Sequence, residues 1–140
     1  MRTIFVDANV IIDWLNADSH DNDICTRVIQ TIVGLYRKPM VSNTSIAITF
    51  YAVSKHLKDK KKVKELMLSA FSLFNVSIED EWVTQQALNS DFTDLEDAIQ
   101  YYSAIKSKAD ANVTFNGFDF VGAKIPVLHP AEFLQLHTIS

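Results

Sequence analysis

The first residues of the chain change from the pattern of a strand to that of a helix. Thr3–Val6 is a short run of β-branched and aromatic residues, which predicts a strand. Apolar residues then recur at helical spacing, so a helix follows almost directly; they are Val10, Ile11, Trp14 and Leu15. Asp7 lies where the predicted strand ends and is therefore the first candidate for chemistry, because ligands of open α/β sheets bind at the carboxyl ends of strands.

Short strands and amphipathic helices alternate along the rest of the chain. We expect helices at about 23–37, from 42–45 through 53, at 63–73, at 79–89, from Thr93 onward and at 130–136. We expect strands at 40–41, at 74–78, near the start of 112–120 and at 125–128, with a polar loop between the last two. Such alternation predicts a parallel α/β sheet. A length of 140 residues fits one domain, residues 1–140.

Composition narrows the class of protein. Hydrophobic residues make up 48% of the chain, enough for a core, and 3 Gly and 3 Pro leave no room for a low-complexity linker. The single Cys25 cannot form an internal disulfide. We see no apolar stretch long enough for a membrane and no signal-peptide pattern, so we expect a cytoplasmic protein. The net charge of -4 argues against overall electrostatic attraction to nucleic acid.

One dense basic segment, 55–64, stands against this acidic background. If a helix continues through it, Lys55, Lys58 and Lys62 share a face. A solvated helix end with a turn is the simpler interpretation and the one that we favour for a run of charge. The alternative is a contact with a phosphate backbone, in which Lys55 would be a substrate-binding residue.

Acidic residues form the second notable pattern. Thr93 and Glu96 have the spacing of a capping box, which predicts a helix from Thr93 with Asp94 in its first turn and Asp97 one turn further. In a parallel sheet, strand ends and helix starts gather at one edge, where several carboxylates can converge. The candidates are Asp7, Asp13, Asp94, Glu96, Asp97 and Asp119.

Converging carboxylates must be paired, protonated or bound to a cation. Oxygen ligands without Cys or His favour Mg²⁺ or Mn²⁺, and such an ion activates water for phosphodiester hydrolysis. Each acid also has a purely structural interpretation: Asp94 and Glu96 favour the positive end of a helix dipole, Asp13 is solvated and Asp119 holds a turn. Asp7 is the hardest to explain in this way, because a strand-end carboxylate between apolar residues needs a partner.

Other chemistries lack a pattern. The sequence contains neither GxxxxGK[ST] nor GxGxxG, so it offers no loop to cradle a phosphate, and it has no GxSxG. The four His residues are scattered without metal-ligand spacing. Cys25, on an apolar helix face, is expected in the core rather than as a nucleophile.

Three segments, 4–13, 94–101 and 113–120, together resemble a PIN domain, and 126–134 resembles the usual end of that family. The resemblance covers essentially the whole chain. It implies a three-layer α/β/α sandwich with a central parallel sheet, and a Mg²⁺- or Mn²⁺-dependent ribonuclease. It further implies a toxin of the VapC type that acts on RNA, is inhibited by a small antitoxin protein and forms a homodimer.

By position, the resemblance makes Asp7, Asp97 and Asp119 the metal-binding and catalytic acids, with Asp94 assisting. It also implies polar positions near the metal at Asn9, Thr114 and Asn116. Two positions depart from the family: Ile48 stands where the second acid is usual, and Phe115 replaces an Arg. Isoleucine cannot bind a metal, and the adjacent Thr49 is a weak ligand. The alternative function is therefore a catalytically impaired PIN-like domain that binds RNA or a protein.

Overall fold

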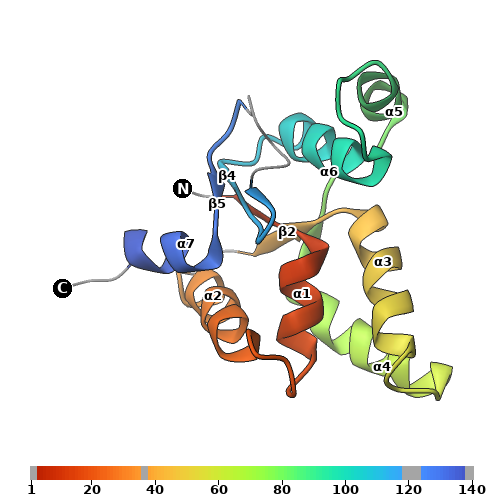
Figure 1. The fold of residues 1–140 in the computed structure, drawn as a ribbon, viewed down its shortest axis with the longest axis vertical. Coiled ribbons are helices and arrows are strands. Elements are labelled where there is room, and N and C mark those ends of the chain that lie inside the picture. The colour runs from red at the N-terminus through yellow and green to blue at the C-terminus, as the bar shows by residue number, and fades with distance from the viewer. Residues whose placement is uncertain (1–2, 36–37, 118–123, 138–140) are drawn as a thin grey trace.

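The structure is a computed structural model that describes residues 3–35, 38–117 and 124–137. Its centre is a sheet of five parallel strands in the order β3-β2-β1-β4-β5 (Figure 1). The strands are β1 (Ile4–Val6), β2 (Pro39–Val41), β3 (Asn75–Val76), β4 (Ala111–Val113) and β5 (Val127–Leu128). The chain moves outward from β1 through β2 to β3 and then returns to the other side of β1. The strand order therefore reverses between β1 and β4, which is where an open α/β sheet binds its ligands.

Helices connect the strands and cover both faces of the sheet. They are α1 (Ala8–Leu15), α2 (Asn22–Gly34), α3 (Asn43–Ser54), α4 (Lys60–Phe71), α5 (Glu81–Leu88), α6 (Leu95–Lys106) and α7 (Pro130–Leu136). Figure 1 shows α1, α2 and α7 on one side of the sheet and α6 with α5 on the other. The α/β/α sandwich that the resemblance implied is thus confirmed. In the part of the chain that the structure describes, no helix has the length and apolar character needed to cross a membrane.

Burial on both faces explains why the strands are apolar at successive positions. Ile4 and Val6 point into the main core with α1, α2 and α7, whereas Phe5 points to the opposite face and packs near Ala104 of α6. Successive side chains of a strand alternate between faces, so each face of the sheet receives apolar residues from β1. A smaller core around Val53 joins α3 to α4.

Two expectations about the helices need correction. The helix after the second acidic segment does not begin at Thr93: Asp94 is its N-cap, and the Asp94 carboxylate accepts a hydrogen bond from Asp97 N at 3.2 Å. Asp forms a cap that is at least as good as Thr, so the Thr93–Glu96 pattern points one residue too early. Asp94 therefore precedes the helix instead of occupying its first turn.

The basic segment is not one helix. α3 ends at Ser54, and α4 begins at Lys60 after its N-cap Asp59, whose carboxylate accepts bonds from the Lys61 and Lys62 amides. Lys55, Lys58 and Lys62 therefore do not share a helix face, and each is exposed. The solvated helix end and turn is the arrangement observed.

Candidate functional site

The carboxyl ends of β1 and β4 bring together residues that are more than one hundred positions apart. In the parallel ladder, Val6 pairs with Val113, so Asp7 and Thr114 leave their strands side by side. The Asp7 N–H donates to the carbonyl of Val113 at 3.0 Å, which extends the ladder by one step. Asp7 is also the N-cap of α1, and its side chain is only 5% exposed. The sequence therefore folds a carboxylate into the switch point of the sheet.

Hydrogen-bond donors surround the Asp7 carboxylate. Oδ1 accepts from the Ala8 N–H at 2.7 Å, and Oδ2 accepts from the Thr114 hydroxyl at 2.7 Å and from Asn9 Nδ2 at 3.4 Å. Donors of this kind stabilise the ionised form of a buried carboxylate and fix its orientation. We call Asp7, Asn9 and Thr114 the Asp7 corner.

Thr114 is the centre of this corner. Its hydroxyl donates to Asp7 and accepts from Asn9 Nδ2 at 3.1 Å and from the Asn116 N–H at 3.1 Å. Asn9 Oδ1 accepts from the Phe115 N–H at 3.3 Å. The end of β1 is thus bonded to the chain that follows β4, and the Asn9 side chain, the Thr114 hydroxyl and the Asn116 N–H meet there.

The start of α6 carries the next pair of acids. α6 leads into β4, and a helix that connects parallel strands runs back along the sheet, so its amino end lies at the edge where strands end. Asp94 caps this end, and Asp97 occupies the first turn, where it is partly buried. Glu96 is exposed beside them. Negative side chains here are stabilised by the helix dipole whatever else they do.

The amino end of α3 has a different character. Ser42, which caps the helix, and Ser45 are fully buried, and their hydroxyls bond to each other and then to Gln100 of α6. Ile48 is partly buried, and the fully buried Thr49 donates its hydroxyl to the Ser45 carbonyl at 2.7 Å. Thr49 is committed to this bond within the helix. We call Ser42, Ser45, Ile48, Thr49 and Gln100 the α3 corner.

Two residues of this edge escaped the sequence reasoning. Gln100 is 2% exposed on α6, and Glu79 accepts two bonds from Thr44, from its N–H and its hydroxyl, each at 2.9 Å. The Glu79 carboxylate thereby supports the amino end of α3. Gln100 could have been noticed as a polar residue among the apolar positions of a predicted helix. No local sequence pattern marked Glu79.

The remaining candidates lie apart or outside the description. Asp13 accepts from the Ser19 hydroxyl at 3.0 Å and holds the turn after α1. Lys55 lies at the carboxyl end of α3, roughly 18 Å along the helix from its start by the rise per residue. Asp119 is outside the described residues. Within the described ranges, no group of three or more His, Cys, Asp or Glu residues is arranged to hold a metal.

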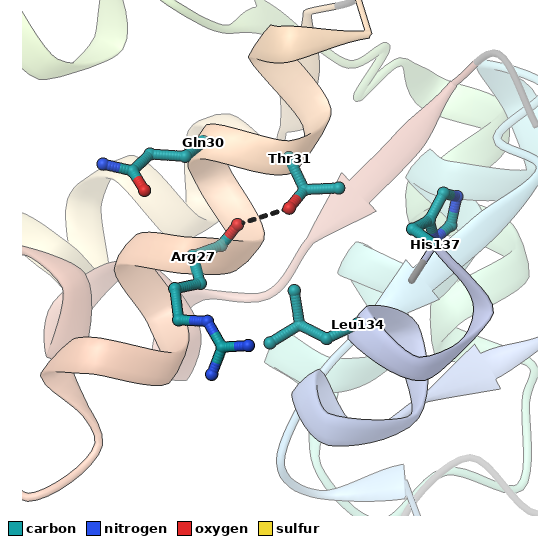
Figure 2. A pocket seen from close by; sticks show the side chains of 5 residues that line it. All are labelled: Arg27, Gln30, Thr31, Leu134 and His137. Carbon is teal, nitrogen blue, oxygen red and sulfur yellow. Dashed lines mark hydrogen bonds between the residues drawn. The ribbon is translucent and has the colours of Figure 1, made fainter. Parts of the chain in front are cut away.

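A hollow in the surface lies elsewhere. Figure 2 shows it between α2 and α7, lined by Arg27, Gln30, Thr31, Leu134 and His137. The Thr31 hydroxyl donates to the Arg27 carbonyl, and His137 Nδ1 bonds to the carbonyl of Phe133. None of the residues that the sequence proposed for chemistry lines it, so we do not associate it with the acids.

Comparison with known proteins places this geometry in a family. The model of the PIN domain family matches residues 3–117. The chain is similar in structure to VapBC2 from Rickettsia felis, which was solved bound to a DNA fragment from its promoter, with a TM-score of 0.68 and 15% identity over 91% of this chain and 98% of that one. It is also similar to VapC20 from Mycobacterium tuberculosis, described as a toxin that cleaves the sarcin-ricin loop, with a TM-score of 0.62 and 17% identity over 83% and 92% of the two chains.

No curated protein matches the chain. At such identities the two solved structures establish a shared fold only. The family model, in contrast, spans most of the sequence and includes the Asp7 corner and the start of α6. The chain belongs to the PIN domain family.

Proposed function

We propose that this chain is a metal-dependent ribonuclease that hydrolyses a phosphodiester bond of RNA and serves as the toxin of a toxin–antitoxin pair. One observation carries the proposal: a buried carboxylate, Asp7, lies at the switch point of the sheet and is oriented by Thr114, Asn9 and the Ala8 amide. A structural cap alone needs only the Ala8 contact. Two further donors, Thr114 from the end of β4 and Asn9 from α1, indicate that the direction of this carboxylate matters.

The donor set suits a hard divalent cation. Asp7 and Asp97 offer carboxylate oxygens, and with Asp119, which lies outside the described residues, they would hold Mg²⁺ or Mn²⁺. When bound, such an ion supplies an activated water and neutralises charge that develops on the phosphate. The described acids alone do not complete this set. Asp119 as the third ligand therefore stays a prediction.

The residues of the Asp7 corner have separable tasks in this scheme. Thr114 donates to Asp7 Oδ2 and so directs the other lone pairs of that carboxylate. Asn9 ties the Phe115 amide to the same point and fixes the chain that leads toward Asp119. Asp94 holds the Asp97 amide and sets where α6, and with it the Asp97 carboxylate, begins.

A metal titration tests the proposal without knowledge of the RNA. Mn²⁺ is titrated against wild type, Asp97→Asn and Glu96→Gln while thermal unfolding is followed, because a ligand that binds the folded state raises Tm. We expect a rise in wild type and in Glu96→Gln, which removes an exposed acid of the same turn, and its loss in Asp97→Asn. An equal rise in all three proteins would exclude Asp97 as a ligand.

RNA cleavage with Mn²⁺ then tests the catalytic role of Asp7. Asn at position 7 keeps an oxygen that can accept from Thr114 but removes the charge, so we expect Asp7→Asn to fold and to lose activity by at least about a hundredfold. Circular dichroism establishes folding. Full activity in folded Asp7→Asn would overturn the proposed role.

A second candidate function is a non-catalytic module that binds RNA or a protein. The α3 corner favours it, because Ile48 has no ligand atom and the hydroxyl of its neighbour Thr49 is bonded within the helix. Large apolar side chains are exposed near α3 and α4, with Tyr51 at 68% and Leu68 at 80%, which supports a protein partner such as a small antitoxin. Absence of both Mn²⁺ binding and cleavage in wild type would make this module the better description. We propose a homodimer for either function.

A further inference from the structure

A buried relay of hydrogen bonds connects the end of β2 to the middle of α6. The Ser42 hydroxyl accepts from the Ser45 N–H at 3.0 Å and lies 3.0 Å from the Ser45 hydroxyl, which in turn lies 2.7 Å from Gln100 Oε1. Ser42 and Ser45 are fully buried and Gln100 is 2% exposed. Buried polar side chains are costly unless they are bonded, so this contact requires a specific alignment of α3 and α6.

The relay has one direction. A hydroxyl has a single proton, and Gln100 Oε1 can only accept, so Ser45 must donate to Gln100. Ser42 therefore donates to Ser45, and the Ser45 amide donates back to Ser42 as the helix cap. With the Gln100 amide oxygen facing α3, each hydroxyl proton of the relay is thus assigned.

A second contact on the same helix serves as a comparison. One turn beyond Gln100, the buried Ser103 hydroxyl donates to the Ile78 carbonyl and hydrogen-bonds with Ser77, just after β3. Gln100 is three residues after Asp97, on the same side of the helix, whereas Ser103 is six residues after it. Gln100 therefore lies about one turn from the acid, and its bond reaches α3.

Apolar packing would not fix α6 along its axis by itself. Besides Gln100 and Ser103, α6 buries Ala98, Tyr101 and Ala104. Hydrophobic contact is non-directional, and packed helices can shift by about 1–2 Å relative to one another. A bond of 2.7 Å between side chains of different helices does not tolerate such a shift. Figure 1 shows α6 beside the end of α3 at which the chain leaves β2.

We propose that Gln100 is a positioning residue that, through Ser45 and Ser42, holds the amino-terminal half of α6 so that Asp97 is placed correctly relative to Asp7. The effect of Gln100 on metal binding rests on the proposed function, whereas its effect on the position of α6 does not. The α3 corner has Ile48 where the family's second acid is usual. In this proposal it supports the site by holding α6, which carries Asp97, in place. Its hydroxyls bind protein groups and need not bind the metal.

The test uses three variants and one matched control in the full chain. Gln100→Met removes the acceptor at similar length, Ser45→Ala removes the donor, and the double variant removes both. Ser103→Ala deletes a buried hydroxyl of the same helix one turn further from Asp97. Amide hydrogen exchange of Ala98 and Ile99 reports how firmly this turn of α6 is held without metal, and electron paramagnetic resonance measures the Mn²⁺ affinity of the site.

We expect Gln100→Met and Ser45→Ala each to raise the exchange rate of Ala98 and Ile99 and to weaken Mn²⁺ binding by about tenfold, the usual scale for a residue that orients a ligand. Because both substitutions break the same hydrogen bond, the double variant should bind Mn²⁺ no more weakly than the weaker-binding of the two single variants. Ser103→Ala should lower Tm comparably while it keeps wild-type Mn²⁺ affinity and the exchange rates of Ala98 and Ile99.

Distinct outcomes separate the two proposals. If wild type binds no Mn²⁺, the proposed function fails, and the exchange rates alone decide whether Gln100 holds the start of α6. If wild type binds Mn²⁺ and Gln100→Met changes neither affinity nor exchange, Gln100 does not position Asp97. Equal loss of affinity in Ser103→Ala would also overturn the proposal, because it would show a general effect of destabilising α6.

Discussion

The Asp7 corner and the α3 corner both place buried hydroxyls beside a strand end, yet they use them differently. In the Asp7 corner, the Thr114 hydroxyl donates to a carboxylate. In the α3 corner, Ser42 donates to Ser45 and Ser45 to the Gln100 amide oxygen, while the Thr49 hydroxyl donates to a helix carbonyl. The first arrangement stabilises and directs a negative charge, whereas the second is neutral and closed. The difference fits our proposals that the Asp7 corner presents a metal ligand and that the α3 corner aligns the helices around it.

The largest effect is expected when the Asp7 carboxylate loses the Thr114 hydroxyl that donates to it. Thr114→Val keeps the shape of the side chain but leaves Asp7 Oδ2, Asn9 Nδ2 and the Asn116 amide without this partner. We expect the free energy of unfolding to fall by about 3 kcal/mol, since one of these bonds involves a charge. Urea unfolding at neutral pH measures the change.

Thr114→Ser is the matched control, because it retains the hydroxyl and should lose no more than about 1 kcal/mol from the missing methyl group. A Thr114→Val protein as stable as Thr114→Ser would mean that the corner does not depend on the hydroxyl. The contrast with the neutral α3 corner would then lose its basis.

The place of Asp7 at the sheet edge was predictable from the sequence for a geometric reason, whereas Asn9 and Thr114 were expected only from the resemblance to the PIN domain family. A strand that ends at Val6 places Asp7 at the sheet edge, and a second strand of the same parallel sheet places Thr114 there as well. The alternation of strands and helices required this edge to exist. Asp119 belongs to the same prediction but lies outside the described residues, so its place in the site stays a prediction.

The second prediction concerns a variant that adds a negative charge to the α3 corner. Ile48→Glu puts a carboxylate where the family usually has one, and the affinity of an oxygen site for a divalent cation grows with the number of charged ligands. We expect Mn²⁺ affinity to rise by about tenfold. Isothermal titration calorimetry on wild type and variant measures it.

Ala47→Glu supplies the control for charge alone, since Ala47 is exposed on the same helix and a one-residue step turns the side chain by about 100°. An equal gain in both variants would reflect general attraction of the cation. No gain in Ile48→Glu would show that this position does not face the ion, and that the departure at residue 48 is not a missing ligand.

The α3 corner was not predictable from the sequence, again for a physical reason. Ser45 and Gln100 are 55 residues apart, and Thr44 and Glu79 are 35 apart. Neither pair follows from local periodicity, because each depends on how α3, α6 and the end of β3 pack in three dimensions. The misplaced helix start at Thr93 is a milder case: two adjacent residues can both cap, and the local pattern does not choose between them.

A smaller effect is expected at a buried polar side chain that belongs to neither corner. Asn112 is 1% exposed in the centre of β4, and its Oδ1 has no hydrogen-bond partner among the residues that the structure describes. Leu has a similar volume and no polar atom, so Asn112→Leu should raise the free energy of unfolding by about 1 kcal/mol. Thermal unfolding measures it, and Asn112→Asp, which buries a charge, should do the reverse. A clear loss of stability in Asn112→Leu would reveal a bond to Asn112 that supports the sheet between the corners.

The smallest effect concerns Cys25, the single cysteine of the chain, which belongs to neither corner. It is fully buried in α2, and burial, followed by the charges of Asp13 and Asp21, raises the pKa of its thiol from 9.0 to about 12. The folded protein should therefore not react with a thiol reagent at pH 9, whereas protein unfolded in guanidinium should react at once. The same shift means that stability falls as pH rises from about 9 toward 12, because only the unfolded chain releases this proton there. The buried position of Cys25 argues against a nucleophilic role. Rapid modification of the folded protein at pH 9 would contradict this, because it would show that Cys25, outside both corners, is accessible and reactive.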